Sequence, residues 1–221
     1  NQLLLLEKLN KEEFERIQKK VAMDFHDEIG NHLTSISMLV QLIMNKDWEI
    51  PEDLKDYLMK IDTESKNLFL GTKDFIWSID PKNNNLKEVF YKIRDYGEEV
   101  FDTTDIKFQV KNGITSDANV KLPPGFTRQI VLIFKEAINN TIKHAGCSVV
   151  SFSVSIYPNM FIIKLSDNGV GFNTDEIEYY NGLKKMKIRG EKIKGDLIFN
   201  SGPENGTEVI LKADMNKKTA I

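Results

Sequence analysis

The longest uninterrupted pattern in this 221-residue sequence runs from Leu3 to about Asn45. It holds no proline and a single glycine, Gly30, and its apolar residues recur at steps of three and four, which indicates one long helix. At 1.5 Å per residue such a helix would be on the order of 60 Å long. The core of a small domain cannot cover that length, so we expect the helix to pack against partner helices.

A second helical pattern follows a break around Pro51 and ends before the sequence DPKNNN at residues 80–85. The two segments predict an antiparallel helical hairpin, which buries its seam poorly when it is alone. We therefore expect two copies to pair as a dimeric four-helix bundle, so that the protein is a homodimer. The alternative is a hairpin that packs only on the C-terminal part of its own chain. Residues 3–21 are expected to form a coiled coil ahead of the bundle.

The pattern changes after the asparagine-rich residues 83–85, the best candidate for a linker. We expect a hairpin domain over 1–81 and a second domain over 86–213. The second domain should contain helices near 86–101, 124–144 and 183–193, together with mostly antiparallel strands. Helices and strands in separate runs predict a two-layer α/β sandwich, so the fold class is α+β with two domains.

Composition excludes several classes of protein. The net charge of −3 gives no reason to expect nucleic acid as a partner, and the single cysteine, Cys147, excludes an internal disulfide. No apolar run approaches the roughly 18 residues of a membrane span, and we expect a cytoplasmic location. Because the sequence begins with Asn rather than Met, we expect a fragment, with room upstream for a sensor or membrane region.

Three groups of residues in the second domain suit a nucleotide. Glu136 and Asn140 are four residues apart on one helix face, where a carboxylate and an amide oxygen could share a magnesium ion completed by phosphate oxygens. Asp167 ends a predicted strand and could accept a hydrogen bond from an exocyclic amine such as that of adenine. Gly169 and Gly171 would let the backbone pass close to a flat base.

The third group lies at the start of the last predicted helix. Gly182 stands where free N–H groups and the helix dipole favour a phosphate. Lys184, Lys185 and Arg189 add positive charge nearby, although each could equally belong to a solvated basic face.

Four stretches of this domain closely resemble motifs of the ATP-binding fold that histidine kinases, Hsp90, gyrase B and MutL share (the GHKL type). They are EAINNTIKHA at 136–145, DNGVGF at 167–172, NGLKKMKIRG at 181–190 and GTEVIL at 206–211. The resemblance implies ATP and Mg²⁺ as cofactors, with Glu136 and Asn140 serving magnesium. It also implies that Lys143 and His144 lie near the phosphates. The remaining implied positions are Asp167 at the adenine amine, Gly182 and Thr207 against the nucleotide, and residues 173–181 as a short mobile lid.

The stretch FHDEIGNHL at 25–33 resembles the phosphoacceptor box of sensor histidine kinases in which Asp directly follows His, and FIWSIDP at 75–81 resembles the same subfamily. The chemistry of His26 and Asp27 is consistent with this resemblance. A neutral imidazole at His26 can attack phosphorus through Nε2 while Asp27 accepts the Nδ1 proton. Gly30, one turn later, would leave room for the phosphate. Asn31 stands where the subfamily usually has Gln, which puts a phosphatase activity in doubt.

These resemblances imply a two-component sensor histidine kinase core, in which Mg-ATP phosphorylates His26 and the phosphate passes to an aspartate on the receiver domain of a response regulator. One alternative is a GHKL-type ATPase clamp without histidine phosphorylation. The other is a non-catalytic dimeric scaffold.

Overall fold

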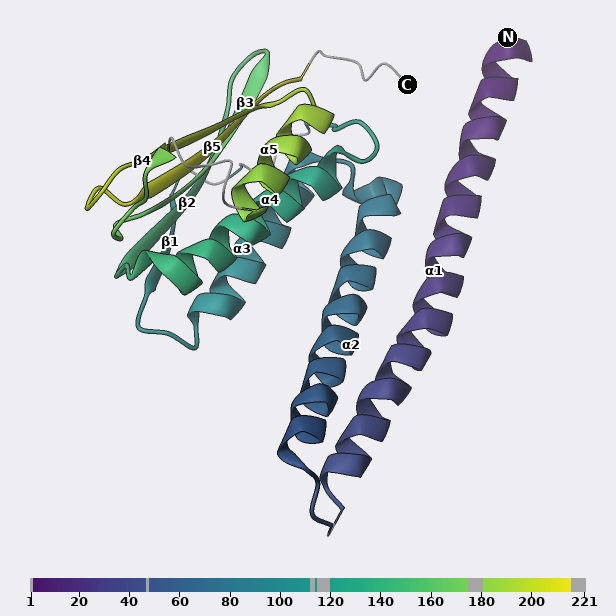
Figure 1. Ribbon diagram of the computed structural model, residues 1–221. Coiled ribbons are helices and arrows are strands. Elements are labelled where there is room, and N and C mark those ends of the chain that lie inside the picture. The colour runs from purple at the N-terminus through teal and green to yellow at the C-terminus, as the bar shows by residue number, and fades with distance from the viewer. Residues whose placement is uncertain (1, 47, 112–113, 115–119, 175–180, 216–221) are drawn as a thin grey trace. The chain divides into compact units, whose positions relative to one another are not determined.

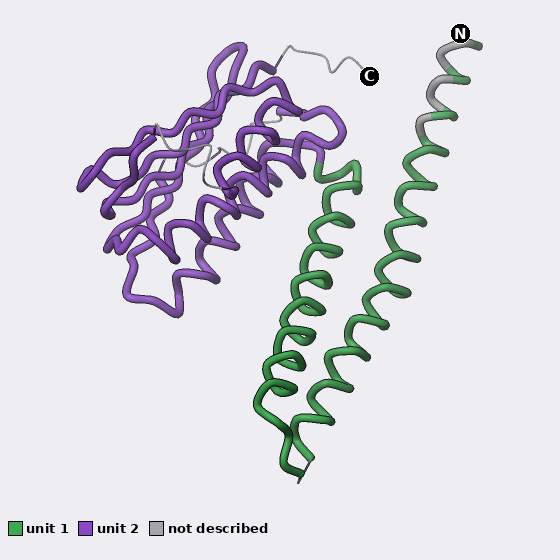
Figure 2. Tube along the Cα trace, in the orientation of Figure 1, with its two compact units in different colours: residues 1–83 green, residues 84–221 purple. Residues whose placement is uncertain are grey.

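The computed structural model describes residues 2–46, 48–111, 114, 120–174 and 181–215. The chain divides into two compact units, residues 1–83 and 84–221 (Figure 2). In the part of the chain that is described, no helix is both long enough and apolar enough to cross a membrane.

The first unit is a helical hairpin. Helix α1 spans Gln2–Met44, α2 spans Glu52–Ile79, and a short 3₁₀ turn, η1, follows at Pro81–Asn83 (Figure 1). Pro51 occupies the position just before α2 and accounts for the predicted break, because proline lacks the N–H that a preceding helical turn would need. Glu52 and Asp53 in the first turn of α2 interact favourably with the positive end of its dipole.

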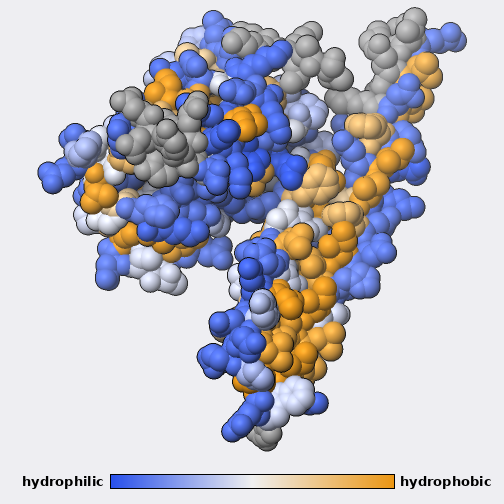
Figure 3. Space-filling model, in the orientation of Figure 1, coloured by the Kyte–Doolittle hydropathy of each residue, from blue (hydrophilic) through white to orange (hydrophobic). Residues whose placement is uncertain are grey.

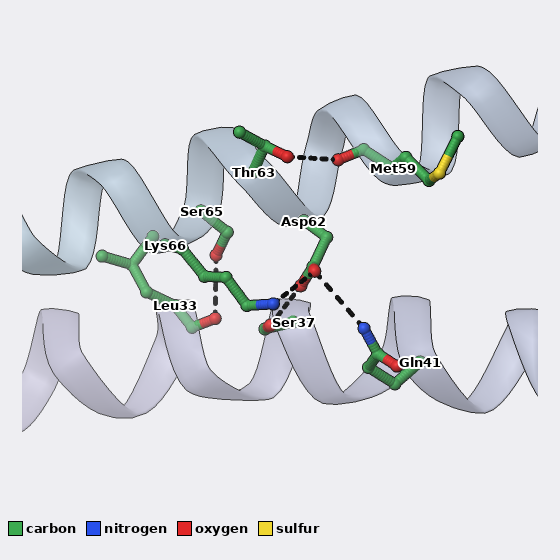
Figure 4. A network of polar contacts seen from close by, with 8 residues as sticks. All are labelled: Leu33, Ser37, Gln41, Met59, Asp62, Thr63, Ser65 and Lys66. Atoms are coloured by element: carbon green, nitrogen blue, oxygen red, sulfur yellow. Dashed lines mark hydrogen bonds and ion pairs between the residues drawn. The ribbon is translucent and has the colours of Figure 1, made fainter. Parts of the chain in front are cut away.

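The seam between α1 and α2 contains a buried polar network centred on Asp62, whose side chain is 11% exposed (Figure 4). From α1, the Ser37 hydroxyl donates to one carboxylate oxygen and Gln41 Nε2 donates to the other at 3.3 Å. From α2 itself, Lys66 Nζ donates at 2.6 Å. Because a buried carboxylate is stable only when it is paired, these bonds fix the position of α2 along α1.

The apolar residues of the hairpin lie mostly outside this seam. Among the described side chains of the first unit, the buried apolar ones are Ala22, Val40 and Leu58. Large apolar side chains remain exposed along both helices, for example Leu39, which is 59% exposed, and Leu68, which is 60% exposed. Figure 3 shows this apolar surface running along the hairpin. Within the hairpin itself, most of the described residues of the predicted apolar stripe remain exposed.

The second unit is a five-stranded sheet with helices on one face (Figure 1). Its strand order is β1-β2-β3-β5-β4, with β1 parallel to β2 and the other pairs antiparallel. The strands are β1 (Lys107–Lys111), β2 (Val149–Ile156), β3 (Met160–Asp167), β4 (Asp196–Ser201) and β5 (Thr207–Asp214). The helices are α3 (Leu86–Phe101), α4 (Phe126–Asn140) with a π-helical turn, η2, at Thr141–Ala145, and α5 (Asn181–Lys192). The predicted α+β fold class is confirmed.

The core of this unit lies between the sheet and its helices. Side chains alternate between buried and partly exposed along β2 and β3, as expected for a sheet covered on one face. Phe152 of β2 is fully buried, with its ring centroid 5.6 Å from that of Phe90, 6.3 Å from Phe134 and 6.5 Å from Phe108. These aromatic contacts join α3, α4 and β1 to the centre of the sheet.

Asp62 makes the stability of the hairpin depend on pH. Hydrogen bonds from Lys66 and Ser37 hold the pKa of Asp62 below its ordinary value of 3.8. The folded state has the lower pKa, so the stabilisation is present above pH 3.8 and is lost as the pH falls through the folded-state value. We predict that Asp62→Asn lowers the Tm of the hairpin at pH 7 and flattens its decline on acidification. Thermal unfolding followed by circular dichroism from pH 7 to about pH 2 tests this, and equal slopes for both proteins would contradict it.

A second prediction concerns the packing of α3 on β1. A methyl group at Gly97 would lie 2.5 Å from Cζ of Phe108, whereas one at Gly71 in α2 would meet nothing within 4 Å. Gly97→Ala should therefore lower the free energy of unfolding by about 1–3 kcal/mol through overpacking. Gly71→Ala, the control, should raise it by roughly 0.5–1 kcal/mol. Guanidinium unfolding measures both changes, and the packing argument fails if the two variants change stability in the same direction.

Candidate active site

A cavity of about 630 Å³ opens in the second unit between α4, the η2 turn, the start of α5 and the ends of β3 and β5. Apolar side chains such as Leu165, Met186 and Val209 form part of its wall. The cavity also brings together eight of the nine residues that the sequence analysis assigned to the nucleotide: Glu136, Asn140, Lys143, His144, Asp167, Gly171, Gly182 and Thr207. An apolar wall beside a few polar groups suits a flat base that carries a charged tail.

The ninth residue, Gly169, lies beside the cavity and does not line it. A methyl group there would lie 2.2 Å from the carbonyl oxygen of Ala145. The Val170 N–H donates to the same oxygen at 2.9 Å. The glycine therefore allows the loop after β3 to pack against the η2 turn, which is a structural role.

Asp167, the last residue of β3, is held by its neighbours. Its Oδ1 accepts the backbone N–H of Gly169 at 2.9 Å and that of Thr207 at 3.2 Å. The Thr141 hydroxyl lies 3.4 Å from Oδ2 and also donates to the carbonyl of Ala137 at 3.1 Å. With Oδ1 engaged by two backbone donors, Oδ2 is the oxygen placed to accept a hydrogen bond from a ligand.

Thr141 is a cavity residue that the sequence analysis missed. It is buried and lies in the first position of the π-helical turn. A threonine inside a helical pattern carries no signal of such a role, since its contact with Asp167 spans 26 residues of sequence. The π-helical turn likewise left no mark in the apolar periodicity, although such turns are frequent at functional sites.

The start of α5 approaches the two predicted magnesium ligands closely. A methyl group at Gly182 would lie 2.5 Å from Glu136 Oε1 and 3.5 Å from Asn140 Nδ2. Only glycine admits this approach without displacing the carboxylate. The described residues contain no group of three or more His, Cys, Asp or Glu that could hold a metal by themselves. Glu136 and Asn140 therefore fit a magnesium ion completed by water and phosphate oxygens.

The basic residues near the cavity fall into two groups. Lys143 and His144 in the η2 turn are exposed at the cavity, whereas Lys184 and Lys185 are exposed on α5 outside its lining. Arg189 is half-buried against α4 and donates to Gln129 Oε1 at 3.4 Å. Burial lowers the pKa of Arg189, and the nearby Arg128 lowers it further. Arg189 thus attaches α5 to α4. Most of the predicted lid, residues 175–180, lies outside the described residues.

His26 lies on α1, in the first unit, and 46% of its side chain is exposed. Its Nδ1 is 3.4 Å from Oδ1 of Asp27, whose side chain is 79% exposed. Gly30, however, is buried and faces α2: a methyl group there would lie 3.4 Å from Cε2 of Phe69. At that distance a methyl group would make only ordinary van der Waals contact, so packing in the hairpin seam does not by itself require a glycine, and the expected room for a phosphate stays a prediction.

Comparison with known proteins bears on the resemblance to histidine kinases and to their ATP-binding fold. Residues 125–217 match the family described as histidine kinase-, DNA gyrase B-, and HSP90-like ATPase. The sensor protein VraS of Staphylococcus haemolyticus is 26% identical over 212 residues, which cover 92% of this chain and 57% of that protein. VraS of Staphylococcus aureus strain COL is 26% identical over 209 residues, covering 91% and 56%. This chain thus spans little more than half the length of these relatives.

Solved structures share the fold. The histidine kinase domain of the Erythrobacter litoralis EL346 blue-light activated histidine kinase superposes with a TM-score of 0.55 at 16% identity, covering 87% of this chain and 94% of that one. The Acinetobacter baumannii histidine kinase AdeS gives a TM-score of 0.55 at 17% identity, covering 86% and 98%. The resemblance inferred from the motifs is confirmed: residues 125–217 match the histidine kinase-, DNA gyrase B-, and HSP90-like ATPase family, and most of the chain is similar to sensor proteins and histidine kinases.

Proposed function

We propose that this chain is the catalytic core of a two-component system, in which ATP bound in the second unit phosphorylates His26. One observation carries the proposal. A single cavity gathers eight predicted nucleotide residues, while an exposed imidazole with a carboxylate neighbour lies on the hairpin of the same chain. An ATPase clamp would also have the nucleotide cavity, but its reaction would not use an exposed imidazole on a helical hairpin.

Within the cavity, each polar group has a proposed partner on the nucleotide. Asp167 Oδ2 accepts the adenine amine, and Glu136 with Asn140 holds magnesium. When bound, that ion neutralises phosphate charge. Lys143 and His144, exposed at the cavity on the η2 turn, contact the phosphates.

Three further residues shape the proposed site. Gly182 admits the first turn of α5, whose free N–H groups favour phosphate. Thr207 holds Asp167 through its backbone N–H at 3.2 Å. Gly171 has φ of +67°, a conformation that favours glycine, and it lines the cavity close to the base.

The reaction at His26 needs little covalent help from the protein. The lone pair of Nε2 forms a bond to the γ-phosphorus, the bond from that phosphorus to the β–γ bridging oxygen breaks, and ADP leaves with the electron pair. Asp27 Oδ1, 3.4 Å from Nδ1, accepts the Nδ1 proton as a hydrogen bond and stabilises the positive charge that develops on the ring. The phosphoramidate then passes its phosphoryl group to an aspartate on the receiver domain of a response regulator.

Two copies of the chain are proposed to pair through their hairpins. The apolar side chains exposed along α1 and α2 of one chain are those that a four-helix bundle would bury. Residues 1–81 would then serve dimerisation and phosphotransfer, with a coiled coil over about 3–21, and residues 86–213 would serve catalysis. The proposed location is the cytoplasm, where the ATP is found.

Incubation with radiolabelled ATP and magnesium tests the proposed function. Wild-type protein should acquire label that is lost in acid and kept in alkali, which is the behaviour of a phosphoramidate. His26→Gln should acquire none, because the amide cannot attack phosphorus, yet it should bind ATP as tightly as the wild type. ATP hydrolysis that survives in His26→Gln, with no acid-labile label in the wild type, would instead identify an ATPase clamp.

The role of Asp167 predicts a change in base selectivity. Asp167→Asn keeps the Oδ1 acceptor for the two backbone N–H groups but places an NH₂ group where adenine also donates. ATP affinity should fall by roughly 10- to 100-fold, because a hydrogen bond to a charged group is lost and two donors face each other. GTP, which carries an acceptor at that position, should lose much less. Fluorescence titration measures both affinities, and an equal loss for ATP and GTP would rule out the proposed contact.

A further inference from the structure

The register of the hairpin identifies the part of α2 that faces His26. Gly30 of α1 packs against Phe69 of α2, and Phe25 of α1 lies against Phe75, with ring centroids 6.0 Å apart. These two pairs lie on either side of His26 along the antiparallel seam. The α2 residues between them, 70–74, are therefore level with His26.

Negative charge dominates around His26 on its own helix. Residues 22–30 include Asp24, Asp27 and Glu28, and they contain no lysine or arginine. A phosphoryl group on His26 would add up to two further negative charges. Each like-charge neighbour would disfavour this added charge, because repulsion between charges near a protein surface is only partly screened by water. Without a cation nearby, the acidic residues of α1 would disfavour phosphorylation of His26.

One cation lies in the facing part of α2. Lys73 is the single basic residue between Phe69 and Ile76, and its Nζ lies 4.5 Å from the centroid of the Phe69 ring. Phe69 is the ring that packs beside Gly30, one helical turn after His26. This cation–π contact therefore holds the ammonium group on the stretch of seam where His26 lies. Lys66, one turn before Phe69, is already paired with Asp62 at 2.6 Å.

From this arrangement we infer that Lys73 contacts the phosphoryl group as it is transferred to His26 and neutralises part of its charge. The inference rests on the proposed function, and it assigns to α2 a catalytic group that the phosphoacceptor motif on α1 does not contain. The step forms and breaks no bond at Lys73. Its ammonium group stays protonated throughout and acts by charge and hydrogen bonding alone.

Kinetics of Lys73→Gln in the full chain test the inference. The rate constant of autophosphorylation should fall about tenfold, because one favourable charge contact is lost in the transition state. The KM for ATP should not change, since Lys73 lies in the first unit and the cavity in the second. Lys73→Arg should keep most of the rate, because it keeps both the charge and the stacking on Phe69. Lys55→Gln is the matched control: it removes an exposed lysine from the same helix near the hairpin turn and should leave the rate unchanged.

A spectroscopic measurement separates a contact with phosphate from a merely structural role. In a ³¹P NMR titration of the phosphorylated protein, the midpoint for protonation of the phosphoryl group should move to higher pH in Lys73→Gln, since the anion has lost a cation. A lysine that only stabilised the hairpin would change the Tm and leave that midpoint where it was. An unchanged midpoint, or a loss shared equally by Lys55→Gln, overturns the inference. If the wild type acquires no phosphohistidine at all, it is the proposed function that fails.

Discussion

The hairpin does not bury most of its apolar residues against itself, and the organisation of the first unit follows from this constraint. Burying one large apolar side chain is worth about 1.5–3 kcal/mol, while a whole domain is typically stable by only about 5–15 kcal/mol. Leaving residues such as Leu39 and Leu68 in water therefore costs an amount comparable to the total stability. The seam inside one chain contains many small and polar groups, among them Gly30, Ser65 and Thr72, beside a few apolar contacts such as Phe25 with Phe75. Burial of these side chains in the proposed dimer would supply the free energy that the hairpin alone does not gain.

The polar contacts in the seam fix the position of α2 along α1 more than they stabilise the hairpin. Apolar surfaces can slide past one another at little cost, but a displacement of α2 by one turn would leave the Asp62 carboxylate buried without its donors from Ser37 and Gln41. The hydroxyl of Ser65, which donates to the carbonyl of Leu33 at 2.9 Å, fixes the same register one turn closer to His26. The seam thereby determines which α2 residues lie level with His26. The register of the hairpin is set by one face of the two helices, and the proposed dimer would use another.

Much of this could be predicted from the sequence because the signals were local. Steps of three and four in the apolar residues gave both long helices, and the four-residue spacing of Glu136 and Asn140 correctly predicted that both line one cavity. Contacts between distant segments left no such signal. The prediction for Gly30 considers only its own helix, whereas Phe69, the side chain that Gly30 faces, lies 39 residues away in sequence. Thr141 was missed for the same reason, since its hydroxyl matters only beside Asp167.

Two of the asparagines between the two units cap the ends of helices, a role that an asparagine-rich composition alone does not reveal. The two units divide within residues 83–85, the segment predicted as the linker. The side chain of Asn83 donates to the carbonyl of Trp77 at 2.7 Å and so caps the end of α2. The side chain of Asn85 accepts the N–H of Glu88 at 2.9 Å and caps the start of α3. Only Asn84 lies between these two caps, and its carbonyl accepts the N–H of Leu122 at 2.9 Å. The nucleotide cavity and His26 lie in different units, so the proposed transfer would require the two units to meet. The hydrogen bonds of these asparagines hold most of the connection to the helix ends on either side of it.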